Sequence, residues 1–142
     1  MKTRRQLIPD VVSDQVLIEL HPYHSAHDAV VLMDCHQVSS VLVVDANGRL
    51  RGIFTLRDVA RRLEGGHLDP NKTRLSQVMT KQPKCVAATE SPQFALRLMQ
   101  DGQFGHLPIT DDGTTEGQIL GIVSRGNLFS EKESVLKFDE YL

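Results

Sequence analysis

The amino-acid sequence predicts an α/β fold made of two similar repeats packed with pseudo-two-fold symmetry, each in the order strand, helix, strand, strand, helix. One observation is a set of residues that recurs 66 positions later: Ser25, Ala29, Leu32, Met33 and Asp45 return as Ser91, Ala95, Leu98, Met99 and Asp111. A second is the step Gly52-Ile53, which returns 69 positions later as Gly121-Ile122. A third is the alternation of helical and strand-like hydrophobic periods within each copy. Such an internal repeat constrains the architecture before any single element is assigned.

The first copy opens with a short predicted strand at 16–20. A helix follows, because the Ser25 hydroxyl suits an N-cap and apolar residues stand at helical spacing at positions 26, 29, 30, 32 and 33. The β-branched run 38–44 predicts a strand, and the Asn-Gly step at the end of 45–48 suits the hairpin turn into a returning strand at 50–54. A second helix is expected to start over 58–63.

The second copy repeats this order. A strand is predicted at 84–87, and Ser91 is the expected cap of a helix with an apolar stripe at positions 94, 95, 98 and 99. Strands are predicted at 106–109 and 119–123, followed by a helix start at 127–129. The three residues that separate the offsets 66 and 69 fit the longer polar turn 111–117, since loops tolerate insertions.

The two copies are expected to depend on each other. A unit of about 60 residues buries too little apolar surface to be secure alone, so we expect the two copies to pack their sheets together. We predict residues 8–64 as the first repeat and 65–75 as a connector rich in Gly, Asp, Pro and Asn. Residues 76–130 form the predicted second repeat, and 131–142 a C-terminal tail.

Composition excludes several classes of function. Lys and Arg number 16 against 18 Asp and Glu, and this net charge of -2 gives no overall attraction for nucleic acid. Every apolar run is shorter than the roughly 20 residues needed to cross a bilayer, and no signal sequence is apparent, so we expect a cytoplasmic protein with no membrane contact. Cys35 and Cys85 form no CxxC pair and are expected to be ordinary reduced thiols.

Both repeats carry a glycine, two apolar residues, a hydroxyl residue (Thr55 or Ser124) and, three residues further, Asp58 or Asn127. A strand that ends in a hydroxyl and leads into a helix directs that hydroxyl and several unpaired amides to one point, where a phosphate fits. A carboxylate on the first turn can accept hydrogen bonds from both ribose hydroxyls. The same pattern also describes an ordinary capped helix, so by itself it leaves both interpretations open.

These motifs resemble the cystathionine β-synthase-type (CBS) domain family. The stretch Gly52-Ile53-Phe54-Thr55-Leu56-Arg57-Asp58 resembles the family's nucleotide signature, and the second copy has Asn127 where the family usually has Asp. The linker 75–80 and the string His106-Leu107-Pro108-Ile109 are also similar to small bacterial CBS pairs, and the likeness runs from about position 8 to 130. The resemblance implies a stand-alone tandem pair, or Bateman module, with no catalytic or DNA-binding domain attached.

The resemblance implies a non-enzymatic regulatory module that binds an adenine nucleotide between the repeats, with AMP or ATP favoured. It further implies a homodimer that signals to an unknown effector protein and requires no cofactor. NAD and S-adenosylmethionine also remain open as ligands. The nucleotide-binding residues expected on this basis are Leu20, His21, Thr55, Arg57, Asp58, Thr80, Lys84, Val86, His106, Pro108, Ser124, Arg125 and Asn127.

The two expected sites are unequal. The first keeps Thr55 and Asp58, and Leu20 with His21 is expected near its adenine; in the second, Asn127 has no charge and can donate as well as accept. Arg57 and Arg125 could neutralise phosphate or could face solvent. His106 could contact ligand or pack at an interface.

Other functions have less support in the sequence. His21, His24 and His27 recur at a spacing of three, which is typical of a helical metal site, but His21 precedes the Ser25 cap and no ligand set is complete, so no metal is expected. No catalytic acid/base pair, nucleophile triad or phosphate loop stands out, so no enzyme activity is expected. The main rival is a structural or protein-interaction module with a vestigial nucleotide site.

Overall fold

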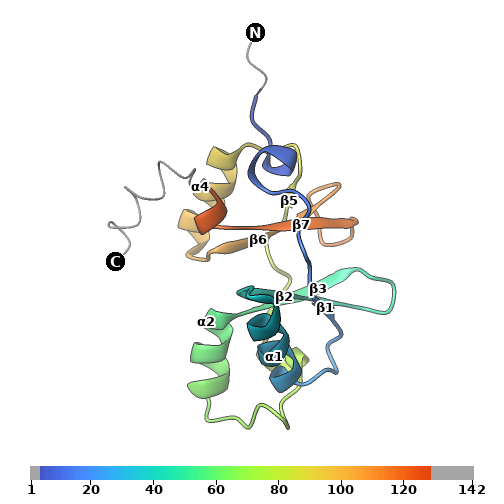
Figure 1. Cartoon of the computed structure of the whole chain (residues 1–142), viewed down its shortest axis with the longest axis vertical. Helices are drawn as coiled ribbons and strands as arrows, with labels where there is room; N and C mark the ends of the chain where they lie inside the picture. The colour runs from blue at the N-terminus through green and yellow to red at the C-terminus, as the bar shows by residue number, and fades with distance from the viewer. Residues whose placement is uncertain (1–3, 129–142) are drawn as a thin grey trace.

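The fold consists of two α/β halves placed end to end, each with one sheet. The computed structural model describes residues 4–128. A four-stranded sheet has the order β1-β2-β3-β4, and a three-stranded sheet has the order β5-β6-β7. The sheets lie toward the middle of the molecule, and α1 and α4 lie beyond them toward opposite ends (Figure 1). The predicted α/β fold of two repeats is confirmed.

The first half contains β1 (Glu19–Leu20), α1 (Ala26–His36), β2 (Ser40–Val44), β3 (Leu50–Thr55), α2 (Leu56–Asp58) and the π-helical turns η2 (Val59–Glu64). Strand β1 runs parallel to β2, and β2 and β3 form the predicted hairpin. Ser25 caps α1, accepting a hydrogen bond from the Asp28 amide at 3.0 Å. The helix predicted at 58–63 begins earlier, at Leu56, because Thr55 is its cap.

The second half contains β5 (Val86–Ala87), α4 (Pro92–Gly102), β6 (His106–Thr110), β7 (Ile119–Ser124) and the 3-10 turn η3 (Gly126–Leu128). Ser91 caps α4 through the Phe94 amide at 3.1 Å. The helices α1 and α4 both end in a left-handed glutamine, Gln37 and Gln103, which are again 66 positions apart. The helix predicted at 127–129 is the turn η3, and Phe129 lies outside the described residues.

The strands that open each repeat are shorter than predicted. The strand expected at 16–20 is only Glu19–Leu20, because these two residues alone pair with β2, while Val16 is 66% exposed. The strand expected at 84–87 is only Val86–Ala87, paired with β6. The apolar residues just before β1 and β5 are thus not part of a strand, because no neighbouring strand pairs with them.

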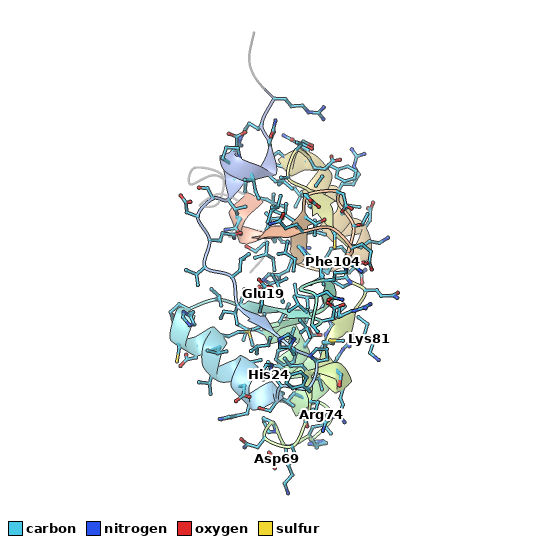
Figure 2. The ribbon with its side chains drawn as sticks, turned by 90° about the vertical axis from the view of Figure 1, so that its right-hand side faces the viewer. Glu19, His24, Asp69, Arg74, Lys81 and Phe104 are labelled. Atoms are coloured by element: carbon cyan, nitrogen blue, oxygen red, sulfur yellow. The ribbon has the colours of Figure 1, made fainter. Side chains whose placement is uncertain are left out.

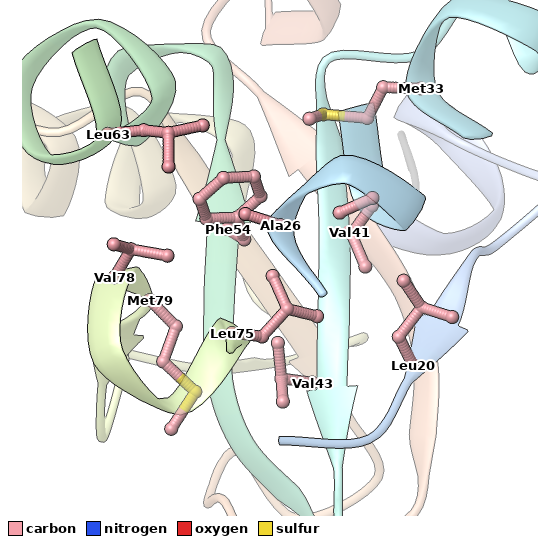
Figure 3. Packing of buried hydrophobic residues seen from close by; sticks show 11 residues of the cluster. Leu20, Ala26, Met33, Val41, Val43, Phe54, Leu63, Leu75, Val78 and Met79 are labelled. Carbon is pink, nitrogen blue, oxygen red and sulfur yellow. The ribbon is translucent and has the colours of Figure 1, made fainter. Parts of the chain in front are cut away.

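Three elements that were not predicted from the sequence pack in the half that their position in the chain does not suggest. The N-terminal turn η1 (Leu7–Val11) contributes Leu7 to the core of the second half. In return α3 (Leu75–Val78) packs into the core of the first half, and β4 (Thr80–Lys81) pairs with β3. Figure 3 shows Leu75, Val78 and Met79 beside Phe54 in that core. The predicted repeats are continuous stretches of the chain, whereas each core also contains residues from outside its own stretch.

The connector between the halves turns at the end of the molecule that is farthest from their junction. Figure 2 shows Asp69 at that end, while Lys81 and Phe104 flank the junction.

The two cysteines are separate thiols. Cys35 is exposed and Cys85 half-buried, and neither is in a disulfide. Burial and the nearby Asp112 carboxylate raise the pKa of the Cys85 thiol to about 11, which keeps it protonated at neutral pH.

The outer edges of β3 and β7 are covered in two different ways. At β3, strand β4 pairs with Gly52 and Ile53. At β7, the Gln15 side chain takes the place of a strand: its Nε2 donates to the Ile122 carbonyl at 2.7 Å and its Oε1 accepts from the Ile122 amide at 2.9 Å. A Cβ on Gly121 would lie 2.7 Å from that Oε1. The repeated glycines Gly52 and Gly121 thus leave room for the chain segments that cover these two edges.

We predict that Gly52→Ala lowers the stability of the protein. The added Cβ would lie 2.5 Å from Met79 Sδ and 2.9 Å from the Thr80 carbonyl oxygen, so β4 would have to shift. Overpacking of this kind costs about 1–3 kcal/mol. Gly105→Ala is the matched control, because its Cβ would meet nothing within 4 Å. Urea unfolding of both variants measures the difference, and equal midpoints would contradict the prediction.

Candidate functional site

Two cavities of similar size lie where the halves meet. Cavity 1 has a volume of about 710 Å³ and is lined by the Thr55–Asp58 end of the first half, the segment around Thr80 to Lys84, and residues 102–106 of the second half. Cavity 2 has a volume of about 770 Å³ and is lined by Ser124 and Asn127 of the second half and by residues 37–40 of the first. The repeat thus produces two related cavities, each built from both halves.

The two cavities differ strongly in charge. Among the described residues, five cationic side chains line cavity 1 against a single acidic one, Asp58; they are Arg57, Arg61, Arg62, Lys84 and Arg125. Among the described residues that line cavity 2 there is no Lys or Arg, and Asp34 is the one carboxylate. Cavity 1 therefore attracts anions although the whole chain has a net charge of -2.

Asp58 is buried at the floor of cavity 1, with its carboxylate bonded inside the protein. Its Oδ2 accepts from the Thr55 amide at 3.0 Å and from the Thr55 hydroxyl at 3.3 Å. Its Oδ1 accepts from the Thr80 hydroxyl at 3.1 Å and forms an ion pair with Arg62 Nε at 3.5 Å. A carboxylate offers about four lone-pair positions, so these four donors use its capacity. A ribose diol could bind Asp58 only by displacing one of them.

Arg62 and Arg57 also have partners within the protein. Arg62 donates to the Met79 carbonyl at 2.7 Å, which attaches η2 to the segment before β4. Arg57 donates to the carbonyl of Gln103, the left-handed residue that ends α4, and so links the halves across cavity 1. Arg61 is exposed at the rim, four residues from Arg57 and hence about one helical turn away. The charge of each side chain still contributes to the cavity.

Asn127 reproduces the Asp58 arrangement without its charge. Its Oδ1 accepts from the Ser124 amide at 2.9 Å and from the Ser124 hydroxyl at 2.8 Å, as Asp58 Oδ2 does from Thr55. Asn127 is exposed, whereas Asp58 is only 6% exposed. The common part of the motif is therefore a cap on the following turn, and the negative charge is a feature of the first half alone.

His106 lies between the two cavities and lines both. Its Nε2 is 2.8 Å from the Ser39 hydroxyl of the first half. Burial lowers the pKa of His106 from its usual value, and the Asp58 carboxylate opposes part of that effect. Of the two alternatives raised by the sequence, packing at the interface is therefore present, and ligand contact stays a prediction.

The structure brings most of the predicted nucleotide-binding residues to the cavities. Those lining cavity 1 are Thr55, Arg57, Asp58, Thr80, Lys84, His106 and Arg125, and those lining cavity 2 are His106, Ser124 and Asn127. Four others line neither cavity: Leu20 and Val86 are buried in the two cores, Pro108 is inside β6, and the His21 ring contacts the Val44 carbonyl at 3.0 Å.

The placement of Leu20 and His21 beside the Thr55 site was wrong. Leu20 is in register with Val43, which pairs with Gly52, while Thr55 pairs with Ser40 at the other end of β2. Leu20 is thus separated from Thr55 by two strand spacings and three residues, or about 10 Å in each direction. The His21 ring instead stacks on Tyr23. No group of three side chains that could hold a metal ion occurs among residues 4–128.

The sequence analysis missed several residues that shape cavity 1. Arg61 and Arg62 follow the signature directly, and their helical spacing from Arg57 and Asp58 could have indicated that they share a face. Gln82, Pro83, Phe104 and Gly105 line the cavity from loops. No motif marks these loop residues, since their position depends on how the halves pack.

Comparison with known families agrees with this geometry. The family described as CBS domain matches residues 8–65 and 75–134. The chain belongs to the CBS-domain family. The two matches correspond to the two repeats, so the chain contains a tandem CBS pair. No helix within residues 4–128 has the length and apolar character needed to span a membrane.

Several known proteins are similar to the chain. The meiotically up-regulated gene 70 protein of Schizosaccharomyces pombe is 31% identical over 132 residues, covering 87% of the chain but 18% of that protein. CBSCBSPB1 of Arabidopsis thaliana is 38% identical over 85 residues, which is 60% of the chain and 15% of that protein. The chain thus spans less than a fifth of the length of these two relatives.

Solved CBS structures share the fold. The CBS-domain containing protein ATU1752 of Agrobacterium tumefaciens is 24% identical with a TM-score of 0.78, over 90% of this chain and 94% of that one. The CBS domain pair of protein MJ0100, solved in complex with 5′-methylthioadenosine and S-adenosyl-L-methionine, is 24% identical with a TM-score of 0.74, over 94% of this chain and 97% of that one.

We predict that Asp58→Ala destabilises the CBS pair by about 2 kcal/mol or more, because it removes a helix cap and leaves the Thr80 hydroxyl and Arg62 without their carboxylate. Asn127→Ala removes the equivalent exposed cap and should cost about 1 kcal/mol. Chemical unfolding of the two variants gives the comparison. A larger loss for Asn127→Ala would show that the Asp58 network contributes little to stability.

Proposed function

We propose that this CBS pair is a non-catalytic regulatory module that binds an adenine nucleotide in cavity 1 through the phosphates of the ligand. The observation that carries the proposal is the charge of cavity 1: five cationic side chains surround one carboxylate. That carboxylate is already paired with Arg62. Arg61 and Lys84 line the cavity and, within residues 4–128, form no ion pair with an acidic side chain. Anionic phosphates supply the missing charge.

The lining also suits the rest of a nucleotide. Ile53, Leu56, Pro83 and Phe104 provide apolar surface of the kind on which a purine ring packs. The Thr55 hydroxyl, which the motif predicts near phosphate, lines the same cavity as these cations. Ribose contacts then come from Thr80 or from Asp58 after one of its internal bonds is exchanged. Among the adenosyl ligands, AMP, ADP or ATP fits this field better than the sulfonium cation of S-adenosylmethionine.

Regulation follows from the position of the cavity. Cavity 1 is built from both halves, so a ligand there contacts both and favours one arrangement of the halves over others. The pair would report this change to an effector protein, and we place it in the cytoplasm as a homodimer. The fold relative MJ0100 was solved with two adenosine-containing ligands, which supports a ligand of this class.

A structural or interaction module is the second candidate, and one observation favours it. The signature residues Thr55 with Asp58, and Ser124 with Asn127, bond to each other as helix caps. Retention of these motifs could therefore reflect folding alone. Arg61 and Lys84 form no side-chain hydrogen bond or ion pair within residues 4–128, so capping does not account for these two cations, and the nucleotide proposal ranks first.

We predict that ATP binds the parent protein and that Arg61→Gln weakens this binding about tenfold, the loss expected for one charge-assisted contact. Arg97→Gln is the matched control, since Arg97 is an exposed residue of α4 that lines neither cavity. Titration calorimetry at low and high salt measures both variants, and affinity should fall as salt rises. If ATP, ADP and AMP all fail to bind, the structural candidate takes precedence.

We also predict a homodimer. Helices α1 and α4 present exposed apolar side chains, with Val31 43% and Phe94 42% exposed, and a two-fold pairing would bury such a patch twice. Sedimentation at tens of micromolar should give twice the chain mass of 15.9 kDa. Val31→Asp should shift the species toward monomer, whereas Lys72→Gln, at an exposed connector residue, should not. A single species of 15.9 kDa for the parent would exclude the dimer.

A further inference from the structure

Within residues 4–128, two residues line both cavities, Leu56 and His106, and of these His106 is the titratable one. It begins β6, and its backbone is in register with Ser124 of β7. Its ring reaches across the junction, so that Nε2 lies 2.8 Å from Ser39 Oγ in the wall of cavity 2. A change at this ring therefore acts on both cavities at once.

The charged groups around His106 are arranged unequally. On the side of cavity 1 the lining contains Asp58 and the cations Arg57, Arg61, Arg62, Lys84 and Arg125; on the side of cavity 2 it contains Asp34. Burial lowers the pKa of His106 below the ordinary value for histidine, more than Asp58 raises it. The ring is thus neutral near pH 7, with one nitrogen as donor and the other as acceptor.

We infer that His106 couples the two cavities by taking up a proton when an anion occupies cavity 1. This inference rests on the proposed function, since it requires an anionic group in that cavity. The proton comes from the solvent and adds to the unprotonated ring nitrogen. Both nitrogens are then donors, so Nε2–H must donate to Ser39 Oγ and the other N–H is available to the anion.

The coupling reaches cavity 2 through the direction of one hydroxyl. A neutral ring allows Ser39 either to donate to the imidazole or to accept from it. An imidazolium allows acceptance only, so the Ser39 hydroxyl hydrogen has to turn away from the ring, toward an acceptor on its own side of the junction. An anion in cavity 1 would thereby fix the direction of the Ser39 hydroxyl hydrogen in the wall of cavity 2. The backbone would not have to move.

The sign of the pH dependence follows. An anion favours the charged imidazolium, so the pKa of His106 is higher in the complex than in the free protein. Binding therefore strengthens as pH falls below the pKa of the complex. It stops strengthening once pH lies below the pKa of the free protein, and between the two values it changes by at most about tenfold per pH unit.

The test is a proton NMR titration of the histidine rings with and without sodium sulfate, matched for ionic strength with sodium chloride. Sulfate keeps a constant charge across the titration, so any shift belongs to the protein. His106→Gln identifies the resonance of His106, and exposed His27 is the internal control. We expect sulfate to raise the pKa of His106 by about one unit, the scale of a nearby opposite charge, and to leave His27 unchanged.

The relay is read from the Ser39 backbone amide in the same samples. Sulfate should shift this resonance in the parent protein and much less in His106→Gln, while the Lys84 amide in the wall of cavity 1 shifts in both. If Lys84 responds but the pKa of His106 does not change, the coupling is refuted and the anion site stands. If the parent shows no response at Lys84 to sulfate, and none to ATP, the anion site itself is refuted and both proposals fall.

Discussion

The buried carboxylate of Asp58 is the interaction on which the arrangement of cavity 1 depends. It caps α2 through Thr55, holds β4 through Thr80 and pairs with Arg62, which in turn holds the Met79 carbonyl. Two segments of the chain, 55–62 and 79–80, thus meet at one side chain. A buried charge without such partners would be strongly destabilising, so the partners and the carboxylate require one another.

The same carboxylate makes the two cavities chemically different. The first half needs cations to balance Asp58, and the cations around it exceed its charge, which leaves cavity 1 positive. In the second half Asn127 forms the same cap with a neutral oxygen, and no Lys or Arg is present among the described lining residues of cavity 2. Two repeats with similar backbones therefore carry different charges at their cavities.

The halves are joined by exchanged segments and by a few polar contacts across the junction. Arg57 with Gln103, Ser39 with His106 and Arg49 with Glu116 all cross it, and the Arg49–Glu116 pair is largely exposed. Exposed ion pairs contribute at most about 1 kcal/mol each. The exchanged segments contribute apolar side chains to both cores, whereas the exposed Arg49–Glu116 pair adds little to the junction. In the proposed function, a ligand in cavity 1 would act on the polar contacts of the junction rather than on either core.

The sequence by itself determined the local structure of this protein. The repeat, the caps at Ser25 and Ser91, the hairpins and the cap motifs at Thr55 and Ser124 could all be predicted, because each depends on residues within one helical turn or one strand pair. Most of the predicted binding residues likewise lie at the cavities, since the motif itself places them at the ends of strands.

Only the tertiary structure decided what lies opposite those motifs. Contacts between distant segments decide several features of the fold. They place Leu75 and Val78 in the first core and Leu7 in the second. They also place Gln15 at the edge of β7 and Leu20 far from Thr55. Tertiary packing also decides that the Asp58 carboxylate is bonded to Thr80 and that His106 lies between two cavities. Periodicity reports which face of an element is apolar, but the partner that covers this face is chosen by packing of the whole chain.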